Sequence, residues 1–173
     1  MKTFVAGFLL GIVVLPLALY LYFSMGAAPV ATSAPELPFE KRIARLARRA
    51  RIRREMPTSV PIAADERNLV AGAAIYREQC TACHALAGQE PTTIAKGMFP
   101  KPPELFRGKG VTDDPPGQTY WKVANGIRLS GMPAFRGSLT EMQLWQVTLL
   151  LTKAHQLSPA VHAALEKQIP HAW

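Results

Sequence analysis

An uninterrupted apolar run near the N-terminus constrains the fold of this chain more than any other feature. Phe4 to Phe23 is twenty residues without a charged or strongly polar side chain. As an α-helix, with a rise of about 1.5 Å per residue, this run is long enough to cross the roughly 30 Å hydrocarbon core of a bilayer. The apolar core of a cleaved signal peptide is shorter, roughly 7–15 residues. The length therefore favours a retained membrane anchor, which we place in residues 1–25.

Two other interpretations of this segment stay open. Gly26, Ala27 and Ala28 follow the apolar run, and small residues there are compatible with cleavage by a signal peptidase. The run also fits, less well, a buried core helix of a water-soluble protein.

The charge of the chain is concentrated at one end. The net charge is +8 over 173 residues, but residues 1–54 hold nine of the 20 basic and two of the 12 acidic side chains. The remainder is nearly neutral, which argues against a basic globular domain that binds nucleic acid. With 49% apolar residues the chain is not wholly disordered. Two cysteines are too few for a disulfide-dense scaffold.

Residues 26–56 predict a linker followed by a basic amphipathic helix. The stretch 27–38 is rich in Ala, Pro, Ser and Thr, which is typical of an extended linker. Residues 39–54 consist largely of good helix formers. Phe39, Ile43, Leu46 and Ala50 recur at helical spacing, and eight cations crowd the rest. Such a helix lies on anionic lipid head groups, contacts an acidic partner, or is only a solvated spacer.

Both cysteines of the chain lie in one pentapeptide, Cys80-Thr81-Ala82-Cys83-His84. In a helical turn this spacing places the two thiols on one face, where they match the two vinyl groups along one edge of a haem. The imidazole of His84 follows directly and is a candidate axial iron ligand. C-x-x-C-H is the attachment motif of c-type haem.

Other chemistries explain this pentapeptide less well. A redox-active C-x-x-C pair is typical of a βαβ context, and no strand pattern is visible here. A structural zinc site needs four ligands, and the remaining histidines, His155, His162 and His171, have no paired spacing.

A second candidate iron ligand, Met132, lies 48 residues after His84. A thioether is a soft ligand that suits haem iron and raises its reduction potential. Methionine more often fills a core, but Met132 stands between Gly131 and Pro133 in an irregular stretch. Met98 is only 14 residues from His84 and Met142 falls in a helical pattern, so both are weaker candidates. The predicted metal ligands are His84 and Met132.

From about Asp65 to Lys153 the sequence resembles a class I cytochrome c domain of the bacterial membrane-anchored kind. The order of its parts matches: a helix ending in C-x-x-C-H, a Pro-rich loop, a middle helix, Gly-Met-Pro, and a closing helix with Trp and Leu. The resemblance implies a small all-α fold around one haem c, bound covalently through Cys80 and Cys83. We expect this domain in residues 57–155 and a helical extension in residues 156–173.

The resemblance also implies roles for individual residues. Gly72 and Tyr76 correspond to a small residue and an aromatic residue that pack against the closing helix. Pro103 corresponds to the proline whose carbonyl accepts the N–H of the proximal histidine, a bond that orients the imidazole. Leu105 corresponds to a residue that packs against the haem ring. For Trp121 and its neighbour Tyr120 two roles stay open: each residue either lines the haem pocket or is an ordinary core aromatic.

Local signals predict four helices in the second part of the chain. The first spans 66–79 with Asp65 as N-cap, and the middle one spans 118–125 and ends at Gly126. We read Ser138 to Glu141 as the capping box of the closing helix. Ser158 and Pro159 begin a last short helix. The buried face expected for the closing helix consists of Leu144, Val147, Leu150 and Leu151. Residues 87–99 have no assigned path, and 111–117 read as a turn-rich loop.

The predicted function is one-electron transfer by a membrane-tethered carrier in a respiratory-type chain, with redox proteins in or at the membrane as donor and acceptor. Two filled axial positions leave no open site, so no catalysis of its own is expected. One alternative is a tightly bound cytochrome subunit of a respiratory oxidase or dehydrogenase complex. The other is a haem enzyme or ligand sensor in which Met132 leaves the iron.

The resemblance implies a single pass through the bacterial inner (cytoplasmic) membrane by residues 4–23, with the haem domain on the periplasmic side. The positive-inside rule favours the opposite side for the cations of residues 41–54. Seventeen residues, 24–40, separate these cations from the apolar run. We expect the requirement for haem attachment to outweigh them at that distance.

Overall fold

The computed structural model describes residues 1–86, 88–106 and 113–167, and its regular secondary structure in these ranges consists of eight α-helices and no strand. The predicted all-α fold class is thus confirmed for this part of the chain. Its internal contacts divide the chain into two units, Met1–Lys41 and Arg42–Trp173. The finer division at residues 25, 56 and 155 stays a prediction.

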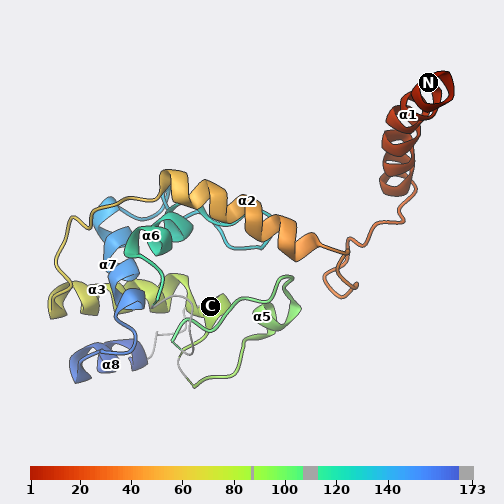
Figure 1. The fold of residues 1–173 in the computed structure, drawn as a ribbon. Helices are drawn as coiled ribbons and strands as arrows, with labels where there is room; N and C mark the ends of the chain where they lie inside the picture. The colour runs from red at the N-terminus through yellow and green to blue at the C-terminus, as the bar shows by residue number, and fades with distance from the viewer. Residues whose placement is uncertain (87, 107–112, 168–173) are drawn as a thin grey trace. The chain divides into compact units, whose positions relative to one another are not determined.

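The first unit contains helix α1, Lys2–Ser24, which includes the whole apolar run (Figure 1). None of its side chains is buried. Of the described helices it alone is long and apolar enough to cross a membrane. A signal sequence has the same properties, so retention of α1 as an anchor stays a prediction.

Helix α2, Glu40–Glu55, matches the predicted basic helix to within one residue at each end. Its carboxyl end belongs to the second unit, where Ile52 is buried and only 2% exposed. The residues of the apolar stripe predicted from the sequence are not buried: Ile43 and Leu46 are 66% and 68% exposed. The periodicity of the sequence predicted an apolar stripe on α2, but it did not identify Ile52 as the buried residue of this helix.

Helix α3, Glu66–Gln79, has the predicted bounds and the predicted cap: the Asp65 carboxylate accepts the backbone N–H of Asn68 at 2.9 Å. It approaches another helix closely at Gly72. A Cβ added there would lie 2.3 Å from the backbone oxygen of Gln146 in α7, Glu141–Thr152. Gly72 therefore packs against the closing helix, as the resemblance implied.

The short helices α4, Thr81–His84, and α5, Thr93–Gly97, follow α3. Helix α6, Pro116–Asn125, begins with a proline in its first turn, two residues before the predicted start. It ends at Gly126, where a Cβ would lie 2.7 Å from the carbonyl oxygen of Met132. Residues 111 and 112 of the predicted loop lie outside the described ranges.

The predicted capping box of α7 was two residues out of register. The N-cap is Thr140, whose hydroxyl accepts the N–H of Gln143, while the Gln143 side chain accepts the N–H of Thr140. Ser138 instead donates to the carbonyl of Phe135 in the preceding turn. Two overlapping sequence patterns fit a capping box here, S-x-x-E from Ser138 and T-x-x-Q from Thr140. Only in the second does the side chain at position N3, Gln143, accept the backbone N–H of the N-cap residue.

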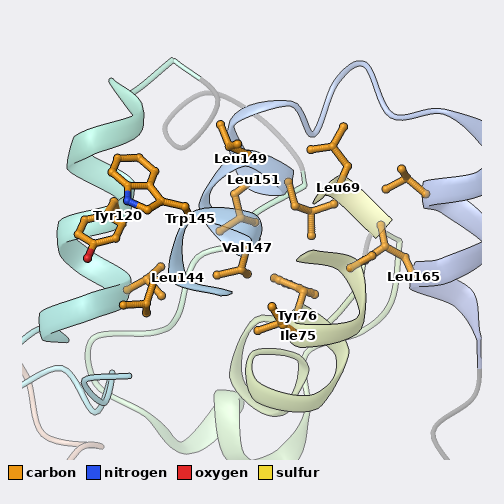
Figure 2. Close-up of a cluster of buried hydrophobic side chains, with 14 of the residues drawn as sticks. Leu69, Ile75, Tyr76, Tyr120, Leu144, Trp145, Val147, Leu149, Leu151 and Leu165 are labelled. Atoms are coloured by element: carbon orange, nitrogen blue, oxygen red, sulfur yellow. The ribbon is translucent and has the colours of Figure 1, made fainter. Parts of the chain in front are cut away.

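The core is formed by α3, α6, α7 and α8, Pro159–Glu166: α7 packs on α3 and α6, and α8 packs on α3 (Figures 1 and 2). Helix α8 begins at the predicted cap, Ser158. The rings of Tyr120 and Trp145 stack at 4.3 Å between α6 and α7. Helix α7 is buried on almost every side, which adds three residues to the predicted face. The buried residues of α7 are Leu144, Trp145, Val147, Thr148, Leu149, Leu150 and Leu151.

Candidate haem-attachment site

The end of α3 and the single turn α4 position the two thiols. The chain leaves α3 at Cys80 and turns again at once, so that the backbone N–H groups of Cys83 and His84 both donate to the Cys80 carbonyl, at 3.1 and 2.9 Å. This turn holds the two cysteine backbones in the one-turn spacing that the sequence predicted. Both residues are partly buried and they form no disulfide with each other.

The Cys80 thiol lies in an apolar setting. Cys80 packs against the hydrophobic core. Burial, reinforced by the nearby Cys83, raises the pKa of the Cys80 thiol to about 12. The thiol is therefore protonated at neutral pH, as expected for a thiol in an apolar setting.

The imidazole of His84 is oriented by one hydrogen bond. Its Nδ1 lies 2.8 Å from the carbonyl oxygen of Pro103. With the proton on Nδ1, the ring donates to this carbonyl and leaves Nε2 unprotonated for a metal. Burial lowers the pKa of His84, while the bond to Pro103 opposes that shift. The neutral ring, which is the form that ligates metals, is favoured.

A buried tyrosine holds the chain just after His84. The Tyr76 hydroxyl donates to the carbonyl of Ala85 at 2.7 Å, and its ring meets Phe106 edge-on at 4.9 Å. Ala85 has a positive φ of 52°, a conformation that a non-glycine residue needs outside support to keep. Burial raises the pKa of Tyr76, so the hydroxyl keeps its proton. Sequence reasoning gave Tyr76 a packing role and missed this hydrogen bond.

Of the segment 87–99, which had no assigned path, the described residues 88–99 contact the C-x-x-C-H turn through Thr92. The Thr92 hydroxyl donates to the carbonyl of Ala82, between the two cysteines. The same hydroxyl accepts the N–H of Ala95 at 3.1 Å and so caps α5. The sequence signal for this contact is limited to an N-cap threonine before a short helical stretch.

The loop around Met132 is held by its backbone. The Ile127 N–H donates to the Met132 carbonyl at 3.1 Å, and the two residues form an isolated antiparallel bridge. Gly131 has a φ of +75°, and a Cβ there would lie 2.6 Å from the terminal methyl of Met98. Met132 is partly buried and packs against the core. Sequence reasoning did not anticipate the contact between Met98 and this loop.

The remaining predicted site residues lie in different surroundings. Leu105 is partly buried and packs against the core cluster. Trp121 is directed to α2, because its indole N–H donates to the Glu55 carboxylate at 3.1 Å. The structure thus brings the C-x-x-C-H turn and Pro103 into one site and links Trp121 with α2. The roles of all seven predicted residues toward a haem stay predictions.

The donor set fits a c-type haem. Two thiols lie in one turn beside an imidazole whose Nδ1 is already engaged, and a thioether is present in a separately braced loop. Among the residues described, no group of three or more His, Cys, Asp or Glu side chains is arranged to hold a metal ion. The Cys-Cys-His set therefore suits a group that brings its own iron better than it suits zinc.

A helical domain with C-x-x-C-H at the end of its first helix defines the class I c-type cytochromes. More particularly, residues 67–150 match the family model described as "Cytochrome C oxidase, cbb3-type, subunit III". This part of the chain is a class I c-type cytochrome domain, and its chemistry is haem-based electron transfer, as an electron carrier or an oxidase subunit. No curated protein and no solved structure matches the chain.

Proposed function

We propose that the protein is a membrane-tethered monohaem electron carrier with His/Met ligation, active in a respiratory-type electron-transfer chain. The observation that carries this proposal is the bond between His84 and Pro103 next to the paired thiols of Cys80 and Cys83. It supports an imidazole prepared for an axial position at the place where the cysteines would hold the macrocycle.

Each of the proposed site residues has its own role toward the haem. When bound, the haem supplies a one-electron iron couple. Cys80 and Cys83 would hold it through thioether bonds, and His84 Nε2 and the Met132 sulfur would bind its iron. If His84 and Met132 both bind the iron, no coordination position would be left for a substrate, which favours electron transfer over catalysis.

Helix α1 is the proposed tether. Its length, its apolar composition and the exposure of its side chains support a bilayer around it. The haem domain then lies on the periplasmic side of a bacterial inner membrane and exchanges electrons with redox proteins in or at that membrane.

A second candidate function rests on the family match. The matching model describes an oxidase subunit, which favours a cytochrome that stays bound in a respiratory complex. The chemistry at the site would be the same. Solubilisation in mild detergent distinguishes the two: a subunit co-purifies with other chains in fixed ratio, and a carrier elutes alone.

The decisive experiment replaces Met132 by Ala. Loss of the sulfur ligand removes the weak far-red band of the ferric protein that reports an iron–methionine bond. The reduction potential falls by a sizeable part of the about 0.8 V range that axial ligands span. Imidazole then binds readily at the vacated position. Visible spectra and a redox titration of the purified holoprotein measure all three effects.

Met142→Ala is the matched control, because this methionine lies on α7 and is 58% exposed. It leaves band and potential unchanged. An intact band in the Met132→Ala protein would contradict the proposed ligand. Met98, whose methyl lies beside Gly131, and His155 are then the next residues to replace. A five-coordinate spectrum of the unmodified protein would instead support a ligand sensor or haem enzyme.

A further inference from the structure

Helix α2 has an inner face that is fixed to the cytochrome domain. Ile52 is buried, and Glu55 accepts the indole N–H of Trp121 from α6. Just beyond the helix, Pro57 packs so closely on Gly117 that a Cβ there would lie 1.9 Å from the Pro57 carbonyl oxygen. The carboxyl end of α2 lies beside α6 (Figure 1). The helix is therefore docked at this end and is not a free spacer.

The opposite face of α2 is apolar and exposed. At about 100° per residue, Ile43 lies on the other side of the helix from Ile52, and Leu46 and Ala50 lie within about 60° of Ile43. Ile43 and Leu46 are two-thirds exposed, and Ala50 is exposed as well. Nothing in the described domain covers this stripe.

Exposed arginines border the stripe on both sides. By helical spacing Arg42, Arg49 and Arg53 follow one edge, and Arg51 and Arg54 follow the other. From Arg42 to Glu55 the helix carries seven basic side chains and one acidic side chain. The docked domain is nearly neutral, so this face is the concentrated positive charge of the second unit.

We propose that the outer face of α2 lies on the anionic lipid head groups of the leaflet from which α1 emerges. This inference rests on the proposed tether. An apolar stripe between rows of arginine is the pattern of a helix that lies in the interface, with its aliphatic side chains at the acyl boundary and its cations among the phosphates. Residues 25–39 alone separate α2 from α1 along the chain, which keeps this lipid surface within reach.

The contacts that Glu55 and Pro57 make with Trp121 and Gly117 of α6 transmit this binding to the domain. Because they join the carboxyl end of α2 to α6, a helix lying on the membrane turns the α6 side of the cytochrome domain toward the bilayer. Lipid charge then controls how the domain is oriented, in addition to the confinement that α1 provides.

The test uses the full-length holoprotein in nanodiscs of phosphatidylcholine alone or of phosphatidylcholine mixed with phosphatidylglycerol. Amide hydrogen exchange of peptides from residues 42–51 is the readout. We expect exchange at least about tenfold slower in the anionic discs, since each basic residue near such a surface adds to the attraction. Peptides from α7 exchange equally in both discs.

Two variant pairs separate charge from apolar contact. Arg42→Gln, Arg49→Gln and Arg53→Gln together abolish the lipid-dependent protection, whereas lysine at the same three positions retains it. Ile43→Gln with Leu46→Gln weakens the protection. Ala44→Gln, which changes an exposed residue of the same helix away from the stripe, leaves it unchanged.

Equal exchange of α2 in both kinds of disc overturns the proposal and leaves the tether intact. Protection that appears only when a purified acidic redox protein is added, whatever the lipid, also overturns it and makes α2 a protein-docking helix. A chain that does not enter the discs contradicts the tether instead. The same protein mixed with vesicles of both compositions then decides the α2 proposal alone.

Discussion

At the scale of single residues, Gly72 decides how closely two helices pack. A Cβ at this position would lie 2.3 Å from the Gln146 carbonyl oxygen, which is backbone and cannot rotate away. Gly72→Ala must therefore separate α3 from α7, and we expect it to lower the free energy of unfolding by at least about 1–3 kcal/mol. The midpoint of urea unfolding of the holoprotein measures the effect.

Gly137→Ala is the matched control for this prediction. Nothing lies within 4 Å of a Cβ at that position, so we expect a change within about 0.5 kcal/mol. Equal midpoints for the two variants would mean that α3 and α7 do not meet at Gly72.

Because of Tyr76, we expect the free energy of unfolding of the domain to vary with pH in the alkaline range. Burial raises its pKa in the folded state, so above about pH 10 the unfolded chain loses this proton while the folded chain keeps it. The free energy of unfolding then falls with rising pH, with a slope of up to about 1.4 kcal/mol per pH unit from this group. Guanidinium unfolding of the unmodified protein and of Tyr76→Phe between about pH 8 and pH 11 separates its share.

The free energies of unfolding of the unmodified protein and of Tyr76→Phe are expected to converge as the pH rises. At pH 8 the Phe variant is less stable by about 1 kcal/mol, because the bond to the Ala85 carbonyl is lost. Above about pH 10 the difference narrows, since the variant has no proton to lose at this position. A constant difference across the range would contradict the pKa shift of Tyr76.

At the scale of elements, the register of the α7 cap is open to a direct test. Thr140→Ala removes the acceptor of the Gln143 N–H and should lower the free energy of unfolding by about 1 kcal/mol. Ser138→Ala removes only an exposed bond to Phe135, and we expect less than about 0.5 kcal/mol. Thermal unfolding of both variants side by side gives the comparison. A larger effect at Ser138 would restore the register expected from the sequence.

Elements with strong local signals were predictable from the sequence. The bounds of α3 were predicted correctly because Asp65 caps it and the C-x-x-C-H turn ends it. Helix α8 likewise begins at its Ser158 cap. Helix α5 was not predicted, because it depends on the contact between Thr92 and Ala82, which belongs to tertiary structure. The packing of Ile52 was missed for the same reason, since periodicity alone does not tell which face of α2 docks.

The site could be predicted in part. The motif and the resemblance located Cys80, Cys83, His84 and Pro103, and the structure places Pro103 on the His84 ring. The hydrogen bond from Tyr76 to Ala85 was not predictable, because its acceptor is a backbone carbonyl, which every residue type has. Trp121 was assigned from its neighbourhood in the sequence, yet consecutive residues of a helix point to different sides, and its indole meets α2.

At the scale of the whole molecule, the orientation in the membrane is the first property to establish. If α1 is retained with Lys2 in the cytosol, the C-terminus lies in the periplasm. A reporter that is active only in the periplasm, fused after Trp173, is then active. The cations of α2 oppose this orientation, so removing them should not reduce reporter activity. An inactive reporter on a well-expressed fusion would reverse the assignment.

The packing of α3 on α7 also has a consequence in time. Gln146 donates to Asn68 across 78 residues of chain, and Gly72 meets the same part of α7. Contacts so far apart in sequence form late, because a long loop must close first. A ribosome delivers Cys80 and Cys83 well before it delivers α7. The domain therefore passes through an interval in which the two thiols have been made and the core that covers Cys80 has not, and the docking of its closing helix ends that interval.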